Sequence, residues 1–580
     1  MMKTRHGHSE DIPLFISRSS VSTCINKTGS WRFARPKYEE KTAPCSAACP
    51  VGEDIARIEM LAHKGLLKEA IELILMENPF PSVCGRVCFH PCETACNRSD
   101  FDEPVAIQRL ERYLGDAFIQ KKMPMSIKKR PANGKKVCVV GAGPAGLAAG
   151  YFFTCLGYAC DIFEARTEPG GLLRWGIPAY RLPGDILANE IKRMEDFGAK
   201  ISCGKTVDRH FLKEVKNRYD AFFIGCGHGR SIPMNIPGDE LAVDGLEFLD
   251  HLKQGKRYAF GGEAAVIGGG NTAVDVSRSL VRMGAAVTLV YRRRRQDMPA
   301  FQSEINMAVE EGVNIMELFS PIQIEADGEG FVLKLQKMKT VGMLSSGSRA
   351  RVVPDDEPKK HLRVEKIFTA IGAEALEPWQ SPPPPNAETL QLDNCTITLE
   401  GIPYVFGGDL INTEKSVADA VASGKQAAIA VDVLFNEGWD SISNRLAACK
   451  VGDGPAISLE SYVGGERKQR SPHVVSYKEI NTDYFEAASR VAASFQAKDE
   501  RITSFSEIET TFTHDRAIQE IQRCFNCGIC NSCDNCWVFC PEVAVIVKNA
   551  VRRINLDYCK GCGICTVECP RNAMILEEEA

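Results

Sequence analysis

Residues 136–164 read KVCVVGAGPAGLAAGYFFTCLGYACDIFE, which predicts a strand, a tight turn, a helix and a second strand. Gly141, Gly143 and Gly146 give the pattern G-x-G-x-x-G directly after the first strand. The first glycine permits the turn, the second lets a pyrophosphate approach the backbone, and the third lets the helix pack closely on the strand. Glu164 ends the second strand, at the position where such units bind a ribose hydroxyl. We therefore expect a dinucleotide-binding βαβ unit, with an ordinary glycine-rich turn as the alternative.

The helix of this unit begins at Pro144 and Ala145. The first N–H groups of a helix have no partner within the helix, and the helix dipole places a partial positive charge there. A phosphate is favoured at such an end. Both residues therefore belong to the predicted cofactor site.

A second nucleotide fingerprint follows a predicted strand at 264–267. Its residues read G-x-G-x-x-A, and the site is assigned to Gly268, Gly270, Asn271, Thr272 and Ala273. The next strand, 287–290, leads into four arginines rather than an acid, and we assign Arg292 and Arg293 to the site. Arginine accommodates a 2′-phosphate where an acid would bind a 2′-hydroxyl. The second site is therefore predicted to bind NADP(H) rather than NAD(H), with a basic surface loop as the alternative.

Composition limits the function classes. The chain has 580 residues, of which 44% are hydrophobic and 25% are charged, which is typical of a soluble protein with about four domains. A net charge of -5 gives no reason to expect nucleic acid or an anionic membrane as a partner. The first residues form no apolar signal segment, and no apolar run is long enough to span a membrane. We therefore expect a cytoplasmic protein.

The 24 cysteines gather in two regions, six of them at 45–96 and ten at 524–569. A long chain without a secretory signal does not use cysteines as a disulfide framework, so both regions predict metal binding. The first region has the cysteines Cys45, Cys49, Cys84, Cys88, Cys92 and Cys96, at spacings of three intervening residues within each group. This spacing suits iron–sulfur clusters, whereas zinc sites usually use C-x2-C pairs. Zinc and unliganded thiols are the alternatives.

The second region contains two runs of the form C-x2-C-x2-C-x3-C-P, the bacterial ferredoxin pattern, in which the fourth cysteine of each run ligates the other cluster. One [4Fe–4S] cluster is therefore predicted on Cys530, Cys533, Cys536 and Cys569. The other is predicted on Cys540, Cys559, Cys562 and Cys565. Cys524 and Cys527 precede the first run at the same spacing, and they are either packing thiols or a distinct site.

Three stretches around the first cysteines and one following helix carry a family resemblance. CPVGEDI (49–55), NPFPSVCGRVC (78–88), CETAC (92–96) and VAIQRLERYL (105–114) resemble the N-terminal domain of the glutamate synthase small subunit and of dihydropyrimidine dehydrogenase. The resemblance implies a helical domain with [4Fe–4S] clusters, one of which has a non-cysteine ligand. Carried over, that cluster would lie on Cys49, Cys88, Cys92 and Glu111.

The family's second N-terminal cluster needs a C-x2-C pair just before Cys45. This chain has EEKTAP (39–44) there instead, so Cys45 and Cys96 keep their places while two ligands are missing. We expect one N-terminal cluster, and a second only if Cys84, Cys24 or a non-cysteine residue substitutes.

The resemblance covers residues 28–435 and implies FAD at the first fingerprint. The family wraps FAD with the segment that here reads EPGGLLRWGIPAYRLP (168–183), and an exposed loop is the alternative for this segment. An aspartate after a glycine pair holds the ribityl chain in flavoproteins with two dinucleotide domains. The implied FAD contacts are Gly171, Leu172, Arg181, Gly408 and Asp409. The C-terminal region resembles the ferredoxin-like subunit of 2-oxoacid:ferredoxin oxidoreductases.

Together these features predict a multidomain α/β protein. An N-terminal arm (1–44) precedes a helical iron–sulfur domain (45–129). A discontinuous, Rossmann-like FAD domain (130–240 and 370–435) surrounds a Rossmann-like NAD(P)H domain (241–369). A connector (436–520), with a helix expected at 488–502, leads to a C-terminal domain with two [4Fe–4S] clusters (521–580).

A nicotinamide gives two electrons as hydride, a cluster accepts one, and a flavin does both. The predicted function is therefore electron transfer between NAD(P)(H), FAD and [4Fe–4S] clusters, as the NAD(P)-reducing subunit of a 2-oxoacid oxidoreductase complex or with ferredoxin as partner. The alternatives are the glutamate synthase small subunit and a non-enzymatic redox scaffold. No acid–base or nucleophilic residue is assigned, and exposed clusters predict oxygen sensitivity and an anaerobic setting.

Overall fold

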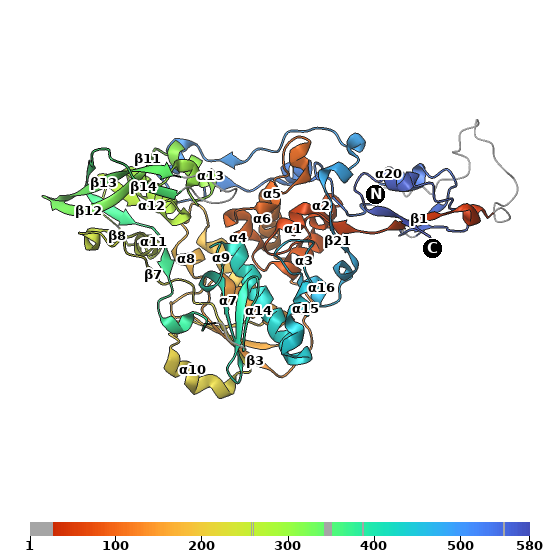
Figure 1. Cartoon of the computed structure of the whole chain (residues 1–580), viewed down its shortest axis with the longest axis horizontal. Coiled ribbons are helices and arrows are strands. Elements are labelled where there is room, and N and C mark those ends of the chain that lie inside the picture. Colours follow the sequence, from red (N-terminus) through yellow and green to blue (C-terminus); the bar gives the residue numbers. More distant parts are fainter. Residues whose placement is uncertain are drawn as a thin grey trace.

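A computed structural model describes residues 27–256, 258, 260–341, 351–384, 388–548 and 551–579. Figure 1 shows three lobes around a helical centre: a sheet domain below, a second sheet domain at the left, and the C-terminal cysteine domain at the right. No helix in the described ranges is both long and apolar enough to cross a membrane. Cys24 lies outside the described residues.

The lower lobe is built on a seven-stranded sheet in the order β18-β19-β20-β6-β3-β4-β5. Its strands are β3 (Lys136–Val140), β4 (Ala159–Phe163), β5 (Lys200–Ser202), β6 (Ala221–Ile224), β18 (Thr389–Gln391), β19 (Cys395–Leu399) and β20 (Pro403–Gly407). β20 lies parallel to β6, so residues before and after the inserted lobe share one sheet. Helices α7 (Pro144–Cys155) and α14 (Val417–Glu437) pack against each other, as expected of a discontinuous domain.

The left lobe has a five-stranded sheet in the order β11-β10-β9-β16-β8, paired in parallel. It consists of β8 (Val243–Asp244), β9 (Glu263–Ile267), β10 (Ala286–Tyr291), β11 (Asn314–Glu317) and β16 (Lys366–Thr369), with helices α11 (Gly245–Lys253), α12 (Asn271–Arg282) and α13 (Gln302–Glu310). An antiparallel sheet of β12 (Phe319–Asp327), β13 (Gly330–Val341), β14 (Arg351–Pro354) and β15 (Lys360–Val364) adjoins it. β7 (Arg230–Ser231) and β17 (Ala373–Glu374) pair where the chain enters and leaves.

The helical centre is the N-terminal cysteine domain. Its helices are α1 (Pro44–Ala48), α2 (Ile55–His63), α3 (Leu67–Glu77), α4 (Pro81–Val87), α5 (Pro91–Thr94) and α6 (Ile107–Gln120). Tyr151 of α7 is 1% exposed and donates to the carbonyl of Leu75 at 2.7 Å. The domain therefore shares one continuous core with the lower lobe.

The described part of the N-terminal arm, from residue 27 on, lies on the C-terminal cysteine domain. β1 (Ala34–Tyr38) pairs antiparallel with β26 (Met574–Glu578), and Arg32 binds the carboxylate of Glu579 at 2.6 and 2.8 Å. The arm is the red strand that reaches the blue domain at the right of Figure 1. The rest of this domain contains α19 (Asn535–Val538), β24 (Val545–Lys548), β25 (Val551–Ile554) and α20 (Ile564–Val567).

The connector is mostly irregular chain with short elements. They are α15 (Ile442–Ala447), α16 (Leu459–Tyr462), β21 (Ser471–Val474), which pairs with β2 (Lys41–Thr42), β22 (Ser494–Phe495), α17 (Lys498–Arg501), β23 (Glu509–Thr510) and α18 (His514–Ile521). The helix expected at 488–502 is wrong except for α17. Instead, the backbone N–H of Ala488 donates to Asp102 at 2.9 Å, and that of Val491 donates to Glu520 at 2.8 Å. Tertiary contacts therefore override local helix propensity.

Candidate functional site

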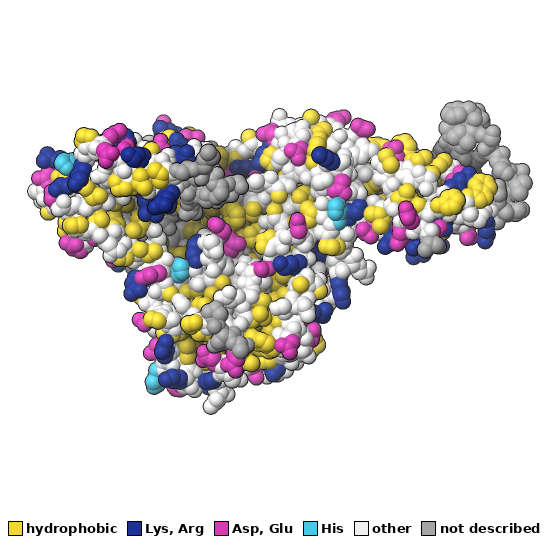
Figure 2. All heavy atoms as spheres, viewed as in Figure 1, with side chains coloured by type: hydrophobic (Ala, Val, Ile, Leu, Met, Phe, Trp, Pro, Cys, Tyr) yellow, Lys and Arg dark blue, Asp and Glu magenta, His cyan; other side chains and the backbone are white. Residues whose placement is uncertain are grey.

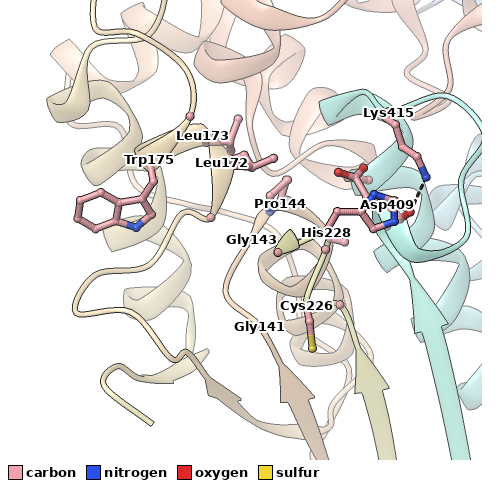
Figure 3. Close-up of a pocket in the computed structure, with 18 of the residues that line it drawn as sticks. Gly141, Gly143, Pro144, Leu172, Leu173, Trp175, Cys226, His228, Asp409 and Lys415 are labelled. Carbon is pink, nitrogen blue, oxygen red and sulfur yellow. Dashed lines mark hydrogen bonds between the residues drawn. The ribbon is translucent and has the colours of Figure 1, made fainter. Parts of the chain in front are cut away.

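A central cavity of about 510 Å³ opens between the lower and left lobes. Figure 3 shows its wall, formed by the turn at Gly141 and Gly143, the short helix at Leu172 and Trp175, and the loop that carries Asp409. Leu172 begins α8 (Leu172–Trp175), and it lines the cavity together with Pro144, Ala145, Gly171 and Gly408. The residues predicted to contact FAD are thus brought together around one space of the size that ligand pockets usually have.

Glycines keep the floor of this cavity free of side chains. A Cβ on Gly146 would lie 1.9 Å from the carbonyl oxygen of Gly141, and one on Gly171 (φ +52°) would lie 2.8 Å from the Cα of Gly143. A Cβ on Gly143 itself would meet only the Gly171 Cα, at 3.9 Å. Backbone is therefore exposed beside the start of α7, where a pyrophosphate is expected.

Glu164 directly follows β4 at the cavity wall and is 8% exposed. Its carboxylate accepts hydrogen bonds from the N–H groups of Ala142 at 2.7 Å and Arg166 at 2.9 Å. These bonds fix the carboxylate against the glycine turn. A carboxylate has about four lone-pair sites, so capacity is left for a ribose hydroxyl.

Another part of the wall carries the predicted Asp409 and two residues that the sequence did not indicate, His228 and Lys415. Burial raises the pKa of Asp409, and burial lowers the pKa of His228. Lys415 lines the cavity beside both residues and donates to the carbonyls of Asp409 and Asn412. His228 and Lys415 stand in no fingerprint, so only their position in the fold identifies them.

Arg181 belongs to the cavity wall but is engaged by the left lobe. Its Nη1 donates to both carboxylate oxygens of Asp275 on α12, at 3.0 and 2.8 Å. Burial raises the pKa of Asp275 to about 6, although Arg181 opposes this. The assignment of Arg181 to the cofactor stays a prediction, and in the described structure the side chain joins the two nucleotide domains.

The second fingerprint opens onto the same cavity. Asn271 and Thr272, at the start of α12, line the cavity. Gly268 (φ +148°) cannot carry a side chain, because a Cβ there would lie 2.3 Å from the carbonyl oxygen of Ala370. Gly270 precedes the helix and has nothing within 4 Å of an added Cβ, while Ala273 is fully buried under it. Two predicted dinucleotide sites therefore face one space.

The arginines after β10 differ in what they contact. Arg294 binds Asp297 at 2.8 and 2.9 Å, and Arg295 donates to Asn306 at 3.0 Å. Arg292 is exposed and Arg293 is half-buried. The assignment of Arg292 and Arg293 to the site stays a prediction.

The C-terminal cysteine domain has two cavities of about 20 Å³ each. The thiols at the first belong to Cys530, Cys533, Cys536 and Cys569, and those at the second belong to Cys540, Cys559, Cys562 and Cys565. These are the two ligand sets predicted from the ferredoxin pattern. Tyr38 of the arm lies with its hydroxyl 3.2 Å from the Cys536 Sγ, so the arm contacts the first site directly.

In the helical centre, the thiol of Cys88 lies within electrostatic range of Cys49 and Glu111, and Cys92 lies within range of Cys49 and Cys88. Asn78 donates to Glu111 at 2.9 Å. The four residues assigned to one cluster are therefore neighbours. Cys45 and Cys96 line a different cavity, together with Cys524 and Cys527.

Three family models match the chain. Residues 34–123 match dihydropyrimidine dehydrogenase domain II, 4Fe-4S cluster; residues 135–380 match pyridine nucleotide-disulphide oxidoreductase; and residues 552–575 match a 4Fe-4S binding domain. The chain is 33% identical over 529 residues to the NADP(+)-dependent formate dehydrogenase subunit beta of Moorella thermoacetica, covering 84% of this chain and 70% of that protein. The chain belongs to this family of iron–sulfur pyridine-nucleotide oxidoreductase subunits.

Two further relatives are similar over much of the chain. The NADPH-Fe(3+) oxidoreductase subunit beta of Geobacter sulfurreducens is 30% identical over 512 residues, covering 84% of this chain and 75% of that one. The NAD-dependent dihydropyrimidine dehydrogenase subunit PreT of Escherichia coli is 33% identical over 399 residues, covering 67% and 90%. The expected resemblance, fold class and enzyme class are confirmed, and the chain is a protein of FAD, NAD(P)H and [4Fe–4S] clusters.

Proposed function

We propose that this chain is the nucleotide-binding, electron-transferring subunit of a larger redox complex. The observation that carries the proposal is the shared cavity, because Asn271 and Thr272 of the second fingerprint line it together with Gly143 of the first. Gly408, beside the aspartate expected to hold the flavin, lines it as well. FAD, when bound, supplies the exchange between a two-electron hydride and single electrons. The protein's own contribution is to position the cofactors. The glycine turn receives the pyrophosphate, and Glu164 binds the ribose. The Arg181–Asp275 pair holds the two nucleotide domains together.

The C-terminal cysteine domain offers a surface for a partner subunit. Trp537, Val538 and Phe539 lie between cluster ligands of the first run and are 46%, 65% and 45% exposed, and Val567 in the second run is 68% exposed. Figure 2 shows hydrophobic side chains on this end of the molecule, at the right. Exposed apolar side chains beside redox centres suit a protein contact. The relatives are named as subunits, which supports the same arrangement here.

We propose a 2-oxoacid oxidoreductase as the partner, because the C-terminal region resembles the ferredoxin-like subunit of such enzymes. A formate-oxidising partner is the second candidate, favoured by the Moorella relative, which matches over 84% of this chain. NADP(+) reduction by the complex purified from its native source, assayed with a 2-oxoacid and separately with formate, distinguishes the two. Activity with formate alone would overturn the 2-oxoacid partner.

The isolated chain tests the electron path. In an anaerobic titration, NADPH is expected to bleach the flavin band and then to reduce the clusters, with electrons reaching a viologen dye. Each chain should contain one FAD. A preparation that binds no FAD, or whose FAD neither NADPH nor NADH reduces, would contradict the proposed function.

Arg292 provides a test of the preference for NADPH. Replacing it by Ser (R292S) removes a charge-assisted contact worth about 1.5–3 kcal/mol, so the KM for NADPH should rise about 10- to 150-fold, with that for NADH nearly unchanged. Steady-state dye reduction with both nucleotides measures this. R294S is the matched control, because Arg294 is already bound to Asp297 and should matter less. Equal effects on NADPH and NADH would rule out a 2′-phosphate contact.

A further inference from the structure

Four cysteines from opposite ends of the chain surround one buried cavity. Cys45 and Cys96 come from the helical centre, and Cys524 and Cys527 come from the segment that leads into the C-terminal cysteine domain. Cys45 and Cys527 are each 8% exposed. The remaining wall is largely apolar, with Ile55, Val105, Ile107 and Phe525 among the lining residues.

Local structure presents each thiol to the cavity. Cys45 lies in α1, and Cys96 directly precedes the turn at 97–100. Asn526, between the other two cysteines, adopts the left-handed conformation (φ 51°), which Asn tolerates better than most residues. Its Nδ2 donates to the carbonyl of Ala56 at 3.0 Å, while Asn97 Nδ2 donates to the Cys527 Sγ at 3.4 Å.

The two halves of the site are joined by buried arginines beside it. Arg98, 2% exposed, donates to the carbonyl of Arg523 at 2.7 Å and stacks its guanidinium over the Phe525 ring at 4.9 Å. Arg523 in turn donates to Asp102 at 3.1 Å and to the carbonyl of Glu103 at 2.6 Å. Arg98 lies two residues after Cys96, and Arg523 directly precedes Cys524, so these contacts hold the two cysteine-bearing segments together.

The cavity matches the two ferredoxin-type cavities. All three have a volume of about 20 Å³ and four cysteine thiols in their walls. Among the described residues, no three His, Cys, Asp or Glu side chains are placed to hold a single metal ion, and this applies equally to the two ferredoxin-type sets.

We propose that Cys45, Cys96, Cys524 and Cys527 hold an additional [4Fe–4S] cluster. The Cys524-x2-Cys527 pair would take the place of the C-x2-C pair that the family resemblance puts before Cys45 and that this chain lacks. The site is thus completed by residues more than 400 positions away in the sequence. The N–H···S bond from Asn97 is of the kind that tunes cluster potentials.

This placement links the other cluster sites into a series. Cys527 is three residues from Cys530, and Cys45 is four residues from Cys49, so the Cα atoms of neighbouring ligand sets are at most about 11 and 14 Å apart along the chain. Arg571 lies within electrostatic range of Cys524 and Cys527 and also of Cys533 and Cys569. Cys92 likewise lies within range of Cys45. The additional cluster would therefore stand between the helical centre and the C-terminal cysteine domain.

The test is a metal count on the anaerobically purified full chain and on two variants. The wild-type chain should contain about 16 iron and 16 sulfide, four per cluster, and no zinc. The double variant C524A/C527A should fall to about 12 iron and lose one spin from the electron paramagnetic resonance spectrum of the dithionite-reduced protein. FAD content of one per chain reports that the double variant is folded.

C84A is the matched control, because Cys84 is a buried thiol of the helical centre that does not line this cavity, and it should keep about 16 iron. A loss of iron in C84A but not in C524A/C527A would overturn the proposal. A content of about 12 iron in the wild-type chain, with or without one zinc, would also overturn the proposal, and this measurement needs no variant. FAD reduction by NADPH is measured in parallel and tests the proposed function, whereas the iron count tests the additional cluster, so the failure of one can be told from the failure of the other.

Discussion

Gly143→Ala is expected to lower the affinity for FAD by about 5- to 150-fold, from an overpacking cost of about 1–3 kcal/mol, while the chain stays folded. An added methyl group meets only the Gly171 Cα, at the ordinary contact distance of 3.9 Å, so the protein accommodates it. The same methyl group stands beside the first N–H groups of α7, where the pyrophosphate is expected. FAD titration of the deflavinated chain, followed by flavin fluorescence, measures the change.

Substitutions at two other glycines distinguish an effect on FAD binding from an effect on folding. Gly184→Ala is the neutral control, since nothing lies within 4 Å of its Cβ, and both affinity and thermal stability should stay at the wild-type level. Gly146→Ala should instead destabilise the fold, because its Cβ would lie 1.9 Å from the Gly141 carbonyl oxygen. Wild-type FAD affinity in Gly143→Ala would show that the pyrophosphate lies elsewhere.

The features that the sequence predicted well are those in which spacing along the chain determines spacing in space. The glycines of both fingerprints act within one turn between a strand and a helix, and each ferredoxin run places three closely spaced thiols at one cavity and its fourth thiol at the other. The two cavities in the C-terminal cysteine domain accordingly have the expected groups of four thiols in their walls, and the role of these thiols as ligands stays a prediction. The pairing of β20 with β6 could also be expected from the sequence, because a discontinuous flavin domain requires strands from both of its parts in one sheet.

The features that were missed depend on contacts between distant segments. The residues expected to complete a second N-terminal cluster were Cys84, Cys24 or a non-cysteine residue, yet the thiols beside Cys45 and Cys96 belong to Cys524 and Cys527. Cys524 and Cys527 stood out in the sequence as a C-x2-C pair without an assigned role, but the sequence around them does not show which other cysteines lie beside them in the fold. The failed helix at 488–502 has the same origin, since Asp102 and Glu520 bind its backbone. Arg181 similarly contacts Asp275, on a helix about 90 residues further along the chain.

A buried ion pair between the helical centre and α14 is expected to have the largest effect on stability. Lys425 and Glu77 have side chains 0% and 1% exposed, with the Nζ 2.5 Å from Glu77 Oε2. Burial lowers the pKa of Lys425, although Glu77 opposes this. Glu77 also accepts from the Ser458 hydroxyl at 2.5 Å and from the N–H of Leu459 at 2.9 Å. One carboxylate therefore connects the helical centre, the lower lobe and the connector.

Glu77→Gln should reduce the free energy of unfolding by about 3–5 kcal/mol, because it leaves the Lys425 ammonium buried without a counter-charge. Chemical unfolding followed by flavin fluorescence measures the loss. The double variant E77Q/K425M should recover most of it, since replacing both members of a buried pair is often neutral. Lys68→Met is the exposed control: its pair with Glu72 spans 3.7 Å with the lysine 57% exposed, and the cost should be below about 0.5 kcal/mol. If E77Q/K425M is as unstable as Glu77→Gln, the unpaired charge is not the cause, and the lost hydrogen bonds to the connector are.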